Sequence, residues 1–123
     1  MDYAVRSGDR ETLIETLDQF AQDRGGRGKS ERADDARRAA QALRDGADGA
    51  HFERIIYVPG ENDRYSVISG TRDEVEAQLR DSDVGFLHLG SPETAAEARA
   101  ALERVAAGAE VVRVGHLLYA VRV

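Results

Sequence analysis

The feature that most constrains this chain is an internal repeat. When the 123-residue sequence is compared with itself at an offset of 62, residues 1–61 align with residues 63–123 without a gap. Fifteen of the 61 aligned positions are identical, whereas roughly five or six identities would arise by chance. The alternative is a coincidental match in an alanine-rich chain. We therefore expect residues 1–123 to form a single domain of two repeats, 1–61 and 63–123, related by an approximate twofold axis.

The second repeat shows its expected elements most clearly. Short stretches of β-favouring residues predict strands, and stretches with apolar residues three and four apart predict helices. A helix is expected to begin after Thr71, whose hydroxyl forms a capping box with Glu74. The pair Gly115-His116 is typical of a type II′ hairpin turn between the last two strands. The predicted strands are 65–69, 84–89, 110–114 and 117–123, and a further helix covers about 92–107.

The first repeat follows the same plan with one departure. Strands are expected at 3–6 and 52–58, and helices at about 9–23 and 30–45. Residues 23–28, Asp-Arg-Gly-Gly-Arg-Gly, stand where the second repeat has the more apolar residues 85–90, Gly-Phe-Leu-His-Leu-Gly. Because three glycines and two arginines are poorly suited to a buried strand, a flexible loop is expected there.

The repeat also predicts how the strands pair. The link at 59–64 would join two strands as a hairpin, and the last strand (119–123) would pair antiparallel with the first (3–6). Such pairing would protect two sheet edges. The expected fold class is therefore α+β, with an internal tandem duplication, a mostly antiparallel sheet and helices packed on one face.

Composition narrows the classes of function. The formal net charge of -6 disfavours nucleic acid and anionic membranes as partners. No cysteine is present, so disulfides and thiolate metal sites are excluded. No apolar run is long enough to cross a bilayer, which favours a cytoplasmic location. The histidines lack metal-ligand spacing and no catalytic triad order is found, so no metal, cofactor or catalytic residue is predicted.

The motif Ser-Gly-x-Arg occurs in both repeats at a predicted strand-to-helix turn. Free backbone N–H groups and the positive end of a helix can hold an anion there, and the arginine would complete the site. The alternative is that the glycines make tight turns, the following residues cap helices, and the arginines are solvated. The candidate anion-binding residues are Ser7, Gly8, Arg10, Ser69, Gly70 and Arg72.

Residues 24–29, which we call the arginine–glycine segment, are a candidate contact loop for a partner. Its cations, Arg24, Arg27 and Lys29, would suit an acidic protein or RNA. The segment fails as a phosphate-binding P-loop, because Asp23 stands where the motif needs glycine and a helix precedes it instead of a strand. The alternative is an ordinary solvated loop between helices.

Four tyrosines form two repeat-related pairs, Tyr3 with Tyr65 and Tyr57 with Tyr119. They could line a shared groove, since tyrosine supplies both stacking area and a hydroxyl. The alternative is ordinary core and sheet-edge packing.

These observations favour a non-catalytic binding or regulatory module. Its partner would be another protein or a second copy of the chain, bound through the open sheet face or the arginine–glycine loop. The alternative is a binding protein or small enzyme that takes a phosphorylated ligand or another anion at the duplicated Ser-Gly-x-Arg turns.

Overall fold

The computed structural model describes residues 3–60 and 65–123, which fall into two compact units with their boundary between these ranges. We call them the first and second repeat. The first contains β1 (Ala4–Gly8), α1 (Arg10–Gly26), α2 (Ser30–Arg44), β2 (Ala50–Phe52) and β3 (Ile55–Pro59). The second contains β4 (Ser66–Gly70), α3 (Arg72–His88), α4 (Pro92–Ala106), β5 (Val111–Val114) and β6 (Leu117–Val121).

The elements of the two repeats correspond at the offset of 62. β1, α1, α2 and β3 begin and end 62 residues before β4, α3, α4 and β6. The strand register corresponds as well, since Val5 pairs with Ile56 and Val67 pairs with Leu118. The expected α+β fold with two similar halves is confirmed.

Each repeat has its own three-stranded sheet. The strand orders are β1-β3-β2 and β4-β6-β5, so the last strand of each repeat lies in the centre. One neighbour of the central strand is parallel and the other antiparallel, which makes both sheets mixed. The parallel partner is possible because two helices separate β1 from β3, and β4 from β6, and provide the crossover that parallel strands need.

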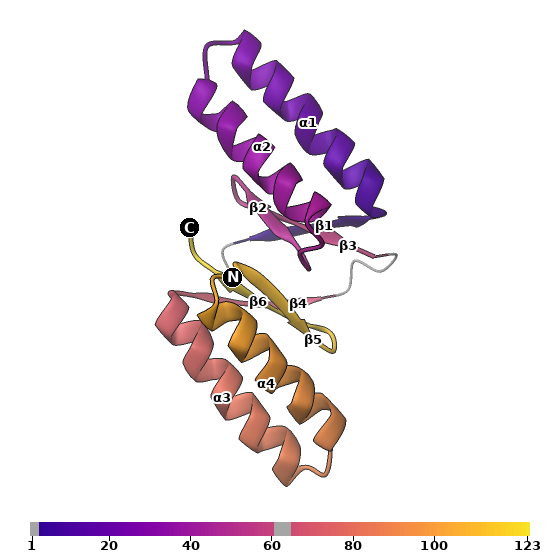
Figure 1. Ribbon diagram of the computed structural model, residues 1–123, viewed down its shortest axis with the longest axis vertical. Coiled ribbons are helices and arrows are strands. Elements are labelled where there is room, and N and C mark those ends of the chain that lie inside the picture. Colours follow the sequence, from indigo (N-terminus) through magenta and orange to yellow (C-terminus); the bar gives the residue numbers. More distant parts are fainter. Residues whose placement is uncertain (1–2, 61–64) are drawn as a thin grey trace. The chain divides into compact units, whose positions relative to one another are not determined.

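In each repeat both helices cover the same face of the sheet, as Figure 1 shows. Their apolar stripes meet the inward-facing side chains of the central strand. In the first repeat this core includes Leu13, Leu17, Leu43 and Tyr57. The corresponding core of the second repeat is built on Val75, Leu79, Val105 and Tyr119. Alanines on α2 and α4 let the helices approach closely.

The expected pairing of the first and last strands is wrong. The segment 119–123 belongs mainly to β6, which is hydrogen-bonded on one edge to β4 and on the other to β5. β1 instead runs parallel to β3. The hairpin expected through 59–64 is also absent as a strand pairing, because β1 and β2 occupy both edges of β3; residues 61–64 themselves lie outside the described residues.

The strand expected at 84–89 is wrong as well, because these residues complete α3 and its turn. The apolar stripe of α3 continues past Leu79 to Phe86, which packs against the core of the second repeat. Tertiary packing therefore overrides the β propensity of a short apolar run. The loop expected at 23–28 is likewise mostly helical, since α1 continues to Gly26.

The single strand expected at 52–58 is divided by a tight turn between β2 and β3. Glu53 occupies this turn with φ of 57°, matching Gly115, which has φ of 59° in the predicted hairpin of the second repeat. Glycine adopts this conformation readily and glutamate does not. The sequence pattern did not predict this turn, because its positive-φ residue is a glutamate and not a glycine.

None of the helices in the described part of the chain combines the length and apolar character needed to span a bilayer.

Candidate functional site

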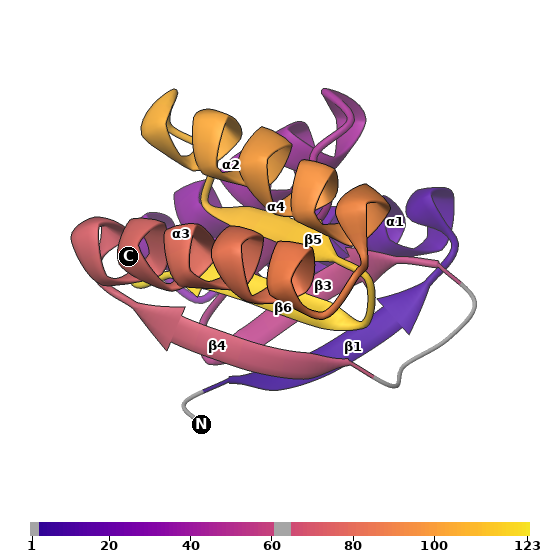
Figure 2. The same ribbon diagram turned by 90° about the horizontal axis from the view of Figure 1, so that it is seen from below.

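The duplicated Ser-Gly-x-Arg motifs lie at strand-to-helix turns, as expected. In Figure 2 the arrowheads of β1 and β4 point toward the beginnings of α1 and α3. Asp9 caps α1 by accepting a hydrogen bond from the Thr12 amide at 2.8 Å, and Thr71 caps α3 by accepting one from the Glu74 amide at 3.2 Å. The hydrogen bonds from the Thr12 amide and then the Thr12 hydroxyl hold the pKa of the Asp9 carboxyl below its usual value. Ser7 and Ser69 lie within β1 and β4.

The arginines of both motifs bind backbone carbonyls. Arg10 donates to the carbonyl oxygens of Leu43 and Ala47, the second at 3.1 Å. Arg72 makes the corresponding contacts with Val105 and Ala109, again at 3.1 Å for the second.

The Leu43 and Val105 carbonyls lie in the last turns of α2 and α4, and the Ala47 and Ala109 carbonyls follow three residues after those helices. The last turn of a helix carries partial negative charge, which favours a cation there. Each arginine therefore ties the start of one helix to the end of its neighbour. The anion-binding hypothesis stays a prediction, but the observed contacts do not favour it, because both guanidinium groups already have acceptors.

The cations of the arginine–glycine segment lie at the end of the α1–α2 helix pair. Arg24 is in the last turn of α1, and Arg27 and Lys29 flank Gly28, whose φ of 74° reverses the chain. Arg32 on α2 adds a fourth cation. Both Arg24 and Arg32 contact the Glu53 carboxylate, at 3.1 and 3.5 Å. We call Arg24, Arg27, Lys29 and Arg32 the basic tip.

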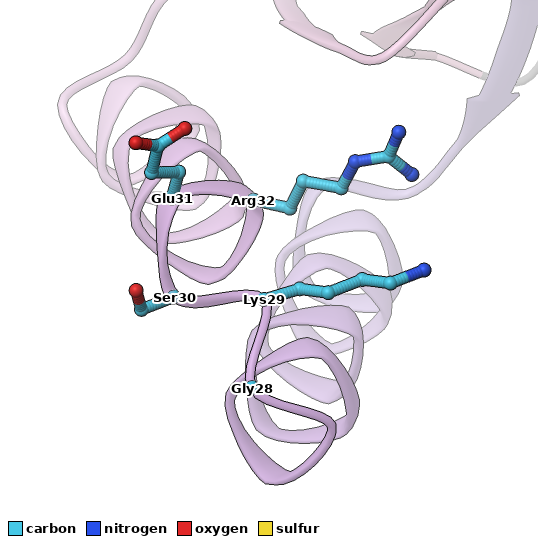
Figure 3. A pocket seen from close by; sticks show the side chains of 5 residues that line it. All are labelled: Gly28, Lys29, Ser30, Glu31 and Arg32. Atoms are coloured by element: carbon cyan, nitrogen blue, oxygen red, sulfur yellow. The ribbon is translucent and has the colours of Figure 1, made fainter.

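A shallow hollow of about 370 Å³ adjoins this tip and is lined by residues 28–32. Figure 3 shows the Lys29 and Arg32 side chains extending in the same direction, while Ser30 and Glu31 point elsewhere. Two positive groups therefore face one side of the hollow.

The four tyrosines occupy two different environments. Tyr57 and Tyr119 are buried in the helix-covered cores. The Tyr3 ring instead lies 4.9 Å from the His51 ring, and Tyr65 lies under the guanidinium of Arg113. His51 and Arg113 alternate with core residues along β2 and β5, so they occupy the sheet face that points away from the helices. Within one repeat, the two tyrosines thus lie on different faces of the sheet, and the shared groove stays a prediction.

Ile56 and Val58 alternate with Tyr57 along β3, and Leu118 and Ala120 alternate with Tyr119 along β6. These four apolar residues therefore lie on the sheet face of each repeat that points away from its helices. Docking of a partner through this face stays a prediction.

An exposed apolar surface that the sequence pattern did not predict lies at the end of the α3–α4 helix pair. Val84, Leu87 and Leu89 are 67%, 50% and 77% exposed, respectively. We call these three residues the apolar tip. The apolar run 84–89 predicts a buried strand, whereas a helical projection continued past Leu79 places Val84 and Leu87 away from the core. His88, expected in that strand, is exposed at the end of α3.

No three His, Asp or Glu side chains gather closely enough to hold a metal ion within residues 3–60 and 65–123. Comparison of the chain with protein-family models, with curated proteins and with solved structures found no match.

Proposed function

We propose that this chain is a non-catalytic cytoplasmic module that binds a protein partner through the apolar tip. The observation that carries the proposal is the exposure of Val84, Leu87 and Leu89 on adjacent turns. Burying large aliphatic side chains is favourable by about 25 cal/mol per Å², so leaving three of them in water costs stability that a partner would recover.

The size of the apolar tip favours a different protein over a second copy of this chain. Three aliphatic side chains at this exposure present on the order of 200–300 Å² of apolar surface. Each partner of a stable complex buries about 800 Å². A small projecting tip can act as an anchor that enters a pocket on a partner. Two such tips that meet across a twofold axis would bury too little surface area for a stable dimer.

The internal repeat supports a binding role for this tip. In the first repeat the positions corresponding to Val84, Leu87 and Leu89 hold Gln22, Gly25 and Arg27. The same helix pair forms there without exposed apolar side chains, so the fold itself does not require them.

A binding experiment tests the proposal. The purified chain is used to capture a partner from host extract, the partner is purified, and its affinity is measured by calorimetry. Leu87→Asp/Leu89→Asp is expected to weaken binding by more than about tenfold, since an anchor residue contributes 2 kcal/mol or more. The matched control is Ala96→Asp/Ala100→Asp, which adds the same charges at exposed positions of α4.

Equal losses in the variant and the control would contradict the proposal. Light scattering supplies the second readout. A dimer that dissociates only in the Leu87→Asp/Leu89→Asp variant would assign the apolar tip to self-association instead.

A further inference from the structure

The basic tip forms a second surface, chemically opposite to the apolar tip. At an offset of 62, its four cations correspond to Phe86, Leu89, Ser91 and Thr94. None of these is charged, yet the second repeat folds to the same helix pair. The cations are therefore not needed to build this structure, and the second repeat serves as an internal control for that conclusion.

Glu53 ties part of the basic tip to the sheet at a conformational cost. Its φ of 57° lies in the left-handed region, where the second repeat has Gly115. A residue with a Cβ is strained in that region, because its Cβ approaches the following carbonyl oxygen. The Glu53 carboxylate nevertheless bridges Arg24 and Arg32, which come from two different helices. Strain retained beside a cluster of charges is common at binding sites.

Two cations of the tip are available to a ligand. Across the described ranges, no ion pair or hydrogen bond engages the side chains of Arg27 and Lys29, and both residues are exposed. Arg24 is held in place from two sides, since its guanidinium also lies 5.4 Å from the centre of the Phe20 ring. Arg24 and Arg32, which both contact Glu53, thus stand beside the exposed cations Arg27 and Lys29.

We propose that the basic tip binds a carboxylate-rich segment of a partner protein. Arg27 and Lys29 would form new ion pairs, and Arg24 and Arg32 would share their remaining donors with the same segment. This surface is distinct from the apolar tip, so the two proposals are tested separately.

A peptide segment fits this surface better than RNA. Recognition of single-stranded RNA uses open aromatic faces for stacking, whereas the ring at this tip, Phe20, lies beneath Arg24. The net charge of -6 also repels an extended polyanion. A short acidic segment confines its charge to the tip, where the cations are concentrated.

Fluorescence anisotropy with a labelled oligo-glutamate peptide tests the proposal on the full chain. Binding should weaken as salt concentration rises, and Arg27→Ala/Lys29→Ala should raise Kd by about three- to tenfold, since each exposed ion pair contributes up to about 1 kcal/mol. The control Arg38→Ala/Arg80→Ala removes the same charge from exposed positions outside the tip. It should leave Kd within about twofold.

Three results would overturn the proposal: no binding of the peptide by the unaltered chain, equal weakening in the control, or tighter binding of a labelled single-stranded RNA of equal charge. Circular dichroism and thermal melting establish that both variants are folded. Loss of partner binding on altering the apolar tip, with peptide binding unchanged, would show that the two surfaces act independently.

Discussion

The two repeats share a backbone but surround their core tyrosines, Tyr57 and Tyr119, with different side chains. In the second repeat, Ser82 lies 2.7 Å from the hydroxyl of Tyr119 and the two groups hydrogen-bond. The first repeat has Phe20 at the position of Ser82, and this ring packs against Phe52 at 5.3 Å. Across the described residues, the Tyr57 hydroxyl, which corresponds to that of Tyr119, is buried without a hydrogen-bond partner.

Comparing the two repeats shows which features occur in both copies of the fold and which side chains can differ between them. The repeated arginine contacts, the strand register and one fully buried leucine, Leu17 or Leu79, are the same in both copies. The side chains at the helix-pair ends differ in charge, size and polarity. We infer that the shared features specify the fold and that the ends were free to diverge.

The largest effect is expected at the shared core. Leu17 and Leu79 are both fully buried and occupy corresponding positions. Leu17→Ala and Leu79→Ala should each lower the free energy of unfolding by about 2–5 kcal/mol, because each leaves a cavity. Urea denaturation measures this loss. A loss below 1 kcal/mol for either variant would show that the two cores are not equivalent.

The repeated arginines come next. Arg10→Ala and Arg72→Ala should each lower the free energy of unfolding by about 1.5–3 kcal/mol, because each removes a charged donor from carbonyl acceptors at a helix end. Thermal melting of the two variants measures the loss. If these arginines instead serve anion binding, the substitutions would leave melting unchanged in phosphate-free buffer and would abolish stabilisation by added phosphate.

The hairpin turns provide a third comparison. Glu53→Gly and Glu53→Ala both remove the ion pairs with Arg24 and Arg32, but only glycine relieves the positive φ. Glu53→Gly should therefore be more stable than Glu53→Ala by about 1–2 kcal/mol. Chemical denaturation of the two variants gives this difference directly. Equal stabilities would mean that the turn adopts a different backbone conformation in solution.

The core tyrosines should respond in opposite ways to loss of the hydroxyl. Tyr119→Phe should lower the free energy of unfolding by about 0.5–1.5 kcal/mol, because it removes the hydrogen bond with Ser82. Tyr57→Phe should be neutral or stabilising, because it removes a buried polar group with no partner. Denaturation curves recorded side by side provide the measurement. Equal destabilisation would contradict the assigned difference between the two cores.

The smallest effect is expected from pH. Burial raises the pKa of Tyr57 in the folded chain, although the Arg6 charge partly opposes this. The folded state therefore favours the neutral phenol. The stability that this group contributes is fully present below the unfolded pKa of about 10. Stability should fall as pH rises above that value, and it should fall less in Tyr57→Phe. Melting temperatures between about pH 9 and pH 11 test this; identical profiles would contradict it.

The sequence predicted the repeat, most helices and the strand-to-helix turns, because these depend on local spacing and on matches at one offset. It did not predict the pairing of β1 with β3, since strand partners depend on contacts far apart in sequence. It also missed the full length of α1 and α3. In both helices the last turn contains glycine or a run of apolar residues, and these local signals conflict with the longer helical stripe.

Predicting the candidate surfaces was harder still. The cations Arg24, Arg27 and Lys29 were identified by composition, but their link through Glu53 required the turn between β2 and β3 to be known. The exposure of Val84, Leu87 and Leu89 was hidden because an apolar run is the usual sign of burial. Applying the repeat offset to the turn at Gly115 would have revealed the one at Glu53.

The central claim is that each repeat closes its own sheet around the same register. Cross-strand nuclear Overhauser effects in the isotope-labelled full chain test it most directly. The account predicts contacts between the backbone protons of Val5 and Ile56, and equivalent contacts between Val67 and Leu118. Contacts from residues 4–8 to residues 119–123, with none to Ile56, would contradict it.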